Sequence, residues 1–284
     1  MTILRTALLC LLGFTLSACS SGPTKDFVRT ADHLETTLQR IQKIAVVADL
    51  GVMHDSKGKY WSIKDSRTAE DGLLAGTQAY MKEKGYQVVS ATAPFVAGFA
   101  DASKPLKSAP AEDGEITEHN PPLFVDGRSP ASVESERPGM LAAMTGTFSM
   151  AAKNAKIPSN ICCSGAARAA IQNLATKAGA DAVLFVYGMG TMVPTGKQVA
   201  QGVATGLLTT VLTAGIITYA QWDASHLDSY AALVDGHTGE VLWTNSLRMK
   251  VGTFLEAQFY QETWPQNVLY HIPSRAPASV AAGK

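Results

Sequence analysis

Apolar residues in the first third of the chain follow two different spacings. In residues 26–41 they recur at three- and four-residue steps, which predicts an amphipathic helix. Residues 43–50, KIAVVADL, are almost continuously apolar and rich in β-branched side chains, as in a buried strand. After an expected loop over 51–64, residues 66–84 predict a helix that ends at a glycine, and residues 86–90, YQVVS, predict a strand. This order of strand, helix, glycine and strand is typical of a βαβ-type unit.

The middle of the chain contains two further helical patterns and one strand pattern. Residues 139–155 and 164–177 each place apolar side chains at helical spacing, and Gly179 follows the second of these segments. Residues 181–187, DAVLFVY, are short and apolar. We therefore expect two helices followed by a buried strand.

A β-hairpin is predicted towards the C-terminus. Residues 229–234 and 241–249 have strand-like patterns, and the turn-forming sequence DGHTGE at 235–240 lies between them. We expect Val241 and Trp243 on one face of the second strand, with Trp243 buried against a helix.

The pattern changes over residues 101–138. This stretch contains six prolines and more acidic than basic residues, which favours a long surface excursion over a core element. Its apolar island, residues 123–125, is the part expected to touch the domain. Residues 255–270 predict a closing helix, in which Pro265 favours a break.

Together these elements predict an α/β fold, with an α+β arrangement also open. We expect a mixed sheet with packed helices in one domain over residues 26–272, interrupted by the insertion 101–138. Residues 273–284 are rich in Pro, Ala, Ser and Gly and are expected to form a disordered tail.

The first residues have the features of an export signal. Arg5 precedes an apolar run over residues 7–16, which is too short to span a bilayer. The run ends in Leu-Ser-Ala-Cys at 16–19, which resembles the bacterial lipobox. The resemblance implies that residues 1–18 are removed, and that Cys19 becomes the lipidated first residue of a tether over 19–25. An ordinary secretory signal and a short membrane anchor are the alternatives.

The lipobox resemblance also implies a location. Cys19 would carry a diacylglycerol and an N-acyl chain such as palmitate, and several acyl chains give stable membrane anchoring. Ser20 and Ser21 follow the cysteine. In sorted lipoproteins of enterobacterial type, the lack of Asp after the cysteine favours the periplasmic face of the outer membrane. No other cofactor is expected.

Charge and motifs argue against several classes of function. The formal net charge is zero, so nothing indicates nucleic acid as a partner, and no lysine-rich run indicates binding to anionic lipid. None of the histidines has metal-site spacing with another, so no metal site is expected. The sequence has no GxSxG, Walker or HExxH motif, and it shows no evident small-molecule substrate.

Two cysteines remain in the mature chain besides the lipidated one. Cys162 and Cys163 are adjacent, and they precede a helix expected to begin near Ser164. In the oxidising periplasm they are expected to form a vicinal disulfide or to be two small buried residues. A helix N-terminus lowers the pKa of a thiol, so a reactive Cys163 stays open as an alternative.

Residues 198–222 form an uncharged segment long enough to cross a bilayer. Gly202 and Gly206 are spaced for close helix approach, and Trp222 ends the segment. A buried helix, or a helix followed by a strand, in the core is the preferred interpretation, because the segment is rich in Thr and Gly. Membrane insertion or oligomer contact through Gly202, Gly206 and Trp222 is the alternative.

Two stretches resemble a known family. Residues 165–189 place a helix before Gly-Ala-Asp and an apolar strand, and residues 229–249 contain VDGHTGEVLW. This order is similar to periplasmic lipoproteins with a TolB-N-terminal-like α/β domain, among them the families of CsgG and LpoB. The resemblance implies a scaffold or adaptor that acts by contact in the cell envelope. The segments 101–138 and 198–222 depart from the family pattern, so a channel is not implied.

Three functions follow from these observations, in order of preference. The first is a non-enzymatic assembly or adaptor protein that binds envelope proteins or itself. The second is an oligomeric outer-membrane secretion or pore subunit that uses residues 198–222. The third is an enzyme that depends on Cys163.

Overall fold

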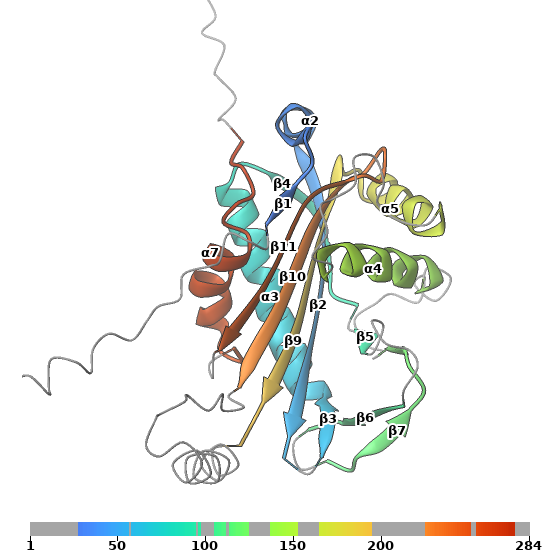
Figure 1. The fold of residues 1–284 in the computed structure, drawn as a ribbon, viewed down its shortest axis with the longest axis vertical. Helices are drawn as coiled ribbons and strands as arrows, with labels where there is room; N and C mark the ends of the chain where they lie inside the picture. Colours follow the sequence, from blue (N-terminus) through green and yellow to red (C-terminus); the bar gives the residue numbers. More distant parts are fainter. Residues whose placement is uncertain are drawn as a thin grey trace, which may run out of the picture.

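A computed structural model of the protein describes residues 28–56, 58–94, 96–97, 105–111, 114–124, 137–152, 165–194, 225–250 and 254–275. One mixed sheet with strand order β1-β11-β10-β9-β2-β3-β6-β7 organises these residues, and β4 pairs with β2 beside this path. Helices lie on both faces of the sheet (Figure 1). The predicted α/β fold with a mixed sheet is therefore confirmed.

Strand β2, Lys43–Asp55, lies in the middle of the sheet. It pairs in parallel with β9, Ala182–Met192, and with β4, Gln87–Thr92. The strand was predicted over 43–50 only, and the loop expected over 51–64 is wrong. The last residues of β2 turn back through an antiparallel hairpin onto β3, Lys59–Ser62, so their backbone groups are paired rather than solvated.

Alternation along β2 divides the core into two layers. Ile44, Val46 and Ala48 pack on the side of α3, Ile63–Glu83, and of the C-terminal helix. Ala45 and Val47 pack on the opposite side. A strand buried on both faces must be apolar at successive positions, which explains the continuous apolar run in the sequence.

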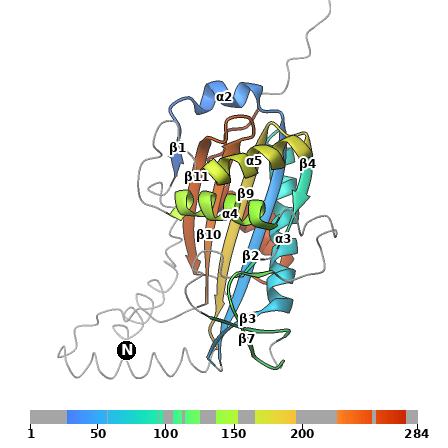
Figure 2. The same cartoon turned by 90° about the vertical axis from the view of Figure 1, so that its right-hand side faces the viewer.

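Two helices cover the second face of the sheet, as Figure 2 shows. They are α4, Arg137–Ala152, and α5, Gly165–Ala178, and they agree with the helices predicted at 139–155 and 164–177 as far as these are described. Helix α5 buries Ala167, Ile171 and Ala175 against the sheet. It is followed by Gly179 with a φ of +62°, a conformation that glycine adopts without strain.

The first predicted helix is largely wrong within the described residues. Arg29–Thr30 form strand β1, which pairs with Trp243 and Thr244 of β11. The helix α2 covers only Leu34–Arg40 and lies across the end of the sheet (Figure 2). The apolar stripe is therefore shared between a strand and a short helix, because pairing with β11 satisfies backbone groups that a longer helix would have used.

The prediction of residues 101–138 as a surface excursion outside the core is partly wrong. Its strands β6, Leu106–Ala109, and β7, Thr117–His119, extend the main sheet beyond β3. The apolar island does contact the domain, because β8, Leu123–Phe124, pairs with β5, Val96–Ala97. Short strands that pair over a long sequence distance leave little periodic signal in a sequence.

The predicted C-terminal hairpin is confirmed as β10, His226–Asp235, and β11, Val241–Lys250. Trp243 is fully buried in the layer that contains the C-terminal helix, as expected. The expectation that Val241 shares its face is wrong, since Val241 packs in the layer of α4 and α5. A register shift between Leu233 and Val234 breaks the two-residue alternation here.

The closing helix runs without a gap through Pro265 to Val268, so the expected break is replaced by a change of helix type before the proline. A π-helical segment, Phe259–Thr263, is followed by α7, Trp264–Val268, with the proline in the first turn of α7. The chain then runs beside the end of α3, where Arg275 N–H donates to the Lys84 carbonyl at 2.8 Å. The first residues of the expected tail are therefore packed. No helix in the described ranges has the length and apolar character to cross a bilayer.

Helix α3 and the π-helical segment approach each other at a glycine. A Cβ added to Gly76 would lie 2.0 Å from the backbone carbonyl oxygen of Tyr260. We expect Gly76→Ala to lower the free energy of unfolding by about 1–3 kcal/mol, because backbone cannot rotate away as a side chain can. Gly139→Ala is the matched control, since its Cβ would meet only Ala170 at 3.7 Å. Urea unfolding should show the control to be neutral or stabilised by up to about 1 kcal/mol, and equal effects would contradict the close approach.

Candidate functional site

The residues singled out from the sequence lie outside the described ranges. They are Cys19, Cys162, Cys163, Gly202, Gly206 and Trp222. The vicinal disulfide, the lipidation and the oligomer contact therefore remain predictions. The described residues show two polar clusters instead, one at the β10–β11 turn and one under α4.

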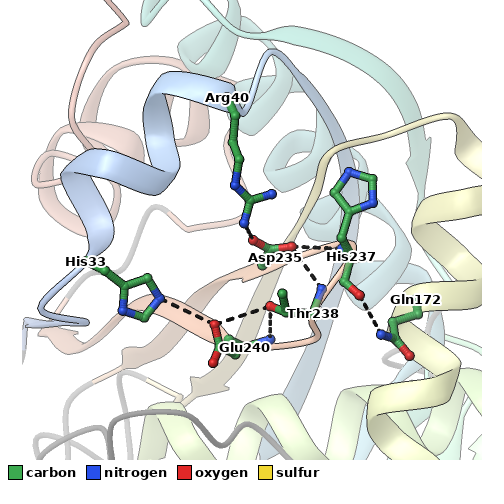
Figure 3. Close-up of polar contacts among 7 residues, drawn as sticks. All are labelled: His33, Arg40, Gln172, Asp235, His237, Thr238 and Glu240. Atoms are coloured by element: carbon green, nitrogen blue, oxygen red, sulfur yellow. Dashed lines mark hydrogen bonds and ion pairs between the residues drawn. The ribbon is translucent and has the colours of Figure 1, made fainter.

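The turn cluster is centred on Asp235, the last residue of β10 (Figure 3). Its Oδ1 accepts the backbone N–H groups of His237 at 2.8 Å and Thr238 at 3.0 Å. Its other carboxylate oxygen forms an ion pair with Arg40 at the end of α2. The carboxylate itself is fully buried, so these donors replace water around its charge.

Further contacts connect the turn to two helices (Figure 3). Gln172 of α5 donates through Nε2 to the His237 carbonyl at 2.5 Å. His33, just before α2, lies with Nε2 3.4 Å from a carboxylate oxygen of Glu240. The prediction of His237 as a turn residue is thus confirmed, because its backbone carries the contacts. The cluster holds α2, α5 and the hairpin in one arrangement.

A second carboxylate lies close to this turn at the start of the central strands. Asp181 Oδ2 accepts the backbone N–H groups of Gln42 and Lys43, both at 2.8 Å. Burial pulls its pKa upward, but the hydrogen bonds from Lys43 and Gln42 outweigh this effect and lower the pKa. The Gly-Ala-Asp motif therefore ends α5 and also fixes the start of β2.

The cluster under α4 contains an acid whose pKa is strongly raised. Asp49 of β2 is 4% exposed and lies on the face covered by α4 and α5. Burial raises its pKa to about 7, against the smaller lowering effect of a hydrogen bond from Val96 N–H. That bond, 2.8 Å long to Oδ1, attaches β5 to the central strand.

Tyr187 is the neighbour of Asp49 on β9. Its hydroxyl lies 2.5 Å from Thr147 Oγ1 of α4, and burial raises its pKa well above the ordinary value, with the Asp49 charge adding to the effect. Thr147 also lies within hydrogen-bond distance of the Ala143 and Met144 carbonyls. The hydrogen bond between Thr147 and Tyr187 therefore connects α4 to β9 of the sheet.

The same face of the sheet carries a surface ion pair further along β10 and β11. Arg248 binds Asp228 with both Nε and Nη2, at 2.5 and 2.7 Å, in a two-pronged geometry. These hydrogen bonds raise the pKa of Arg248. The Arg248 side chain is 64% exposed, whereas the Asp228 side chain is nearly buried. The guanidinium is therefore held in place while it faces solvent.

The carboxylates of these clusters bind backbone N–H groups and do not present a reactive group to solvent. Asp49 can change its charge near neutral pH, but it is enclosed by strands and by α4. In the described ranges, no three His, Cys, Asp or Glu side chains gather closely enough to hold a metal ion. What the clusters do chemically is to bind backbone N–H groups and so fix loops and strand ends.

The turn at residues 235–240 was predicted from the sequence, but the binding of backbone N–H groups by the carboxylates was not. A lone acid in the apolar run KIAVVADL was a signal for Asp49, because a charge in a buried strand needs a partner or a raised pKa. Arg40 and Asp235 are 195 residues apart, and no local pattern connects them.

Comparisons with known proteins establish no family for this chain. No protein-family model matches it, and no curated protein matches it. Lipoprotein GNA1162 from Neisseria meningitidis matches with 18% identity over 74% of this chain and 81% of its own, at a TM-score of 0.27. A PelC dodecamer from Paraburkholderia phytofirmans matches with 11% identity over 78% of this chain and 87% of its own, at a TM-score of 0.26. At such TM-scores, neither match carries an argument about fold or function.

Proposed function

We propose that this chain is a lipid-anchored cell-envelope protein that acts as a non-enzymatic scaffold or adaptor. The lipobox-like Leu-Ser-Ala-Cys at residues 16–19 supports the anchor, with Cys19 as the acylated residue. Acyl chains on Cys19 would hold the folded domain at a membrane. The outer membrane and its periplasmic face belong to the same proposal, which rests on the serines that follow Cys19.

The use of three carboxylates, of which those of Asp49 and Asp235 are buried, is the observation that carries the contact role. Asp49, Asp181 and Asp235 each accept backbone N–H groups from a different segment. Each of them fixes one structural feature: the β5 attachment, the start of β2 or the β10–β11 turn. A domain whose strand ends and turn are fixed in this way presents a rigid surface, which lowers the entropy cost of binding.

The exposed side chains also suit protein contact. Tyr270 is 56% exposed and Met189 is 36% exposed, and Arg248 is held by Asp228. Tyr, Met and Arg are enriched in the cores of protein interfaces, where rigid or preorganised side chains bind at low entropy cost.

The anchor is tested by a cysteine substitution in cells. With Cys19→Ala, we expect a chain without acyl groups, which either keeps its uncleaved leader and stays at the membrane through it or loses the leader and appears in the soluble fraction. Cys10→Ala is the matched control, since Cys10 lies in the leader outside the lipobox, and it should fractionate as the unaltered chain does. Membrane association of a Cys19→Ala chain that has lost residues 1–18, or acyl chains still present on that variant, would contradict the lipid anchor.

The adaptor role is separated from its alternatives by two further variants. A detergent-stable ring that disappears on deletion of residues 198–222, with the domain still folded, would contradict the adaptor and support a secretion or pore subunit. A cellular phenotype of Cys163→Ser in a folded protein would contradict a non-enzymatic role. The proposal predicts neither result.

A further inference from the structure

Helix α4 lies across the sheet above β9, β10 and β11 (Figure 2). It packs through apolar side chains, among them the fully buried Ala143 and Met144, and through the hydroxyl of Thr147. Thr147 Oγ1 lies 2.8 Å from the Ala143 carbonyl oxygen and 2.5 Å from the Tyr187 hydroxyl of β9. Because a carbonyl oxygen can only accept, Thr147 donates to Ala143 and the Tyr187 hydroxyl donates to Thr147. The proton of Tyr187 is therefore used to hold α4 on the sheet.

Asp49 lies beside Tyr187 on the same face of the sheet. The two residues are partners across the parallel β2–β9 pair, and the Asp49 charge raises the pKa of the Tyr187 hydroxyl. Within the described ranges, the Asp49 carboxyl has one hydrogen bond, from Val96 N–H, and no ion pair. Burial raises its pKa to about 7. The carboxyl therefore gains its charge near neutral pH in a place where little replaces water around that charge.

The elements around Asp49 bring few titratable groups close to it. Strands β4 and β5 and the buried residues of α5 contribute none. The one charged residue of α4 is Arg137, its first residue. On the same face, the other titratable side chains of β2, β10 and β11 lie nearer the strand ends: Lys43, Asp55, His226, Asp228, Tyr230, Arg248 and Lys250. Asp228 is already paired with Arg248.

Ionisation of Asp49 weakens the attachment of α4 rather than that of β5. An N–H group donates more strongly to a carboxylate than to a neutral acid, so the bond from Val96 is kept. Helix α4 offers Asp49 no hydrogen bond in the described part of the chain, so the charge gains hydration when the helix moves away. A carboxylate also competes with Thr147 for the proton of Tyr187, because an O–H group donates more strongly to a charged acceptor.

We propose that Asp49, Tyr187 and Thr147 form a proton-operated latch of α4, which is closed while Asp49 is neutral and loosened when Asp49 releases its proton to water. Opening admits water to the carboxylate and exposes apolar side chains that α4 now covers, including its own Met144. The surface that the domain offers to a partner then depends on pH. The inference goes beyond the proposed function, since a latch requires neither a lipid anchor nor a partner.

Residue-resolved hydrogen exchange of the protein in mild detergent tests the latch. Protection is compared at about pH 5 and about pH 7.5, after correction for the intrinsic pH dependence of amide exchange. A carboxyl pKa that is raised in the closed form and ordinary in the open form favours opening as the pH rises towards 7. We expect the protection of the α4 amides to fall about 10- to 100-fold, and to become lower than that of the α3 amides.

Three variants assign the effect to the latch. Asp49→Asn should keep α4 protected at the higher pH, because the amide carries no charge that gains from hydration. Asp181→Asn is the matched control: it makes the same change at an acid whose pKa is lowered, and it should keep the fall in protection. Thr147→Val should lower the protection of α4 already at the lower pH, because Tyr187 loses its acceptor.

Two results on the unaltered chain would overturn the latch, so the decision does not depend on whether a variant folds. One is an α4 whose protection is the same at both pH values. The other is equal protection of α4 and α3 at both pH values, which would mean that the whole domain opens together and that the raised pKa acts without a latch. A fall that persists in Asp49→Asn would assign it to another group, such as His226, and would also contradict the proposal. These results do not bear on the acylation of Cys19, which is measured separately.

Discussion

Stability is expected to fall by about 4 kcal/mol between about pH 4 and about pH 7 through Asp49 alone. Burial raises the pKa of Asp49 from 3.8 to about 7 in the folded chain. Over this range the folded chain holds a proton that the unfolded chain has released. A raised carboxyl pKa therefore favours folding at low pH, and the benefit is lost as the pH rises towards 7. Urea unfolding across this pH range measures the slope.

Asp49→Asn isolates this effect because the amide stays neutral and its oxygen can still accept the Val96 N–H. We expect the variant to lose this part of the pH dependence and to be more stable than the unaltered chain near pH 8. Asp49→Leu should lose the same slope but cost about 1–3 kcal/mol relative to Asp49→Asn, since Val96 N–H then has no acceptor. A variant Asp49→Asn that keeps the full slope would contradict the raised pKa.

Asp235→Ala is expected to lower the free energy of unfolding by about 3 kcal/mol. The substitution leaves the N–H groups of His237 and Thr238 without their acceptor and removes the partner of Arg40. Arg40→Ala should cost only about 1 kcal/mol, because its side chain is 47% exposed and water can replace it. Urea unfolding of both variants makes the comparison.

Asp235→Asn serves as the control for the turn, since its amide oxygen can still accept both N–H groups. The free energy of unfolding of Asp235→Asn should lie between that of the unaltered chain and that of Asp235→Ala. If Arg40→Ala costs as much as Asp235→Ala, the ion pair rather than the turn dominates, and the account of the turn cluster is wrong.

Local pattern predicted the elements that depend on local interactions. The β10–β11 hairpin was found because DGHTGE separates two strand-like runs. Helix α3 was found because its capping residue, its terminal charges and the stop at Gly85 are local signals. Strands β3 and β6 were missed because they are short and pair with each other through Trp61 and Ser108, far apart in the sequence. Their stability comes from pairing in the sheet, not from the propensity of their own residues.

The polar clusters could be predicted only in part, because some of their contacts join segments that are far apart in the sequence. The turn at Asp235 follows from the tendency of Asp to accept N–H groups two and three residues on. Its contact with Arg40 depends on how α2 crosses the end of the sheet, and α2 is much shorter than the predicted helix. The face of Val241 was mispredicted because a bulge in the hairpin changes the alternation, and no single-strand pattern reports a bulge.

The intact mass and N-terminal sequence of the protein, purified from membranes of a Gram-negative host, decide whether it is lipid-anchored at Cys19. We expect a chain that begins at Cys19 and carries a diacylglycerol and an N-acyl chain on that residue. A chain that begins elsewhere, or that begins at Cys19 with a free thiol and no acyl group, would contradict a lipid-anchored envelope protein.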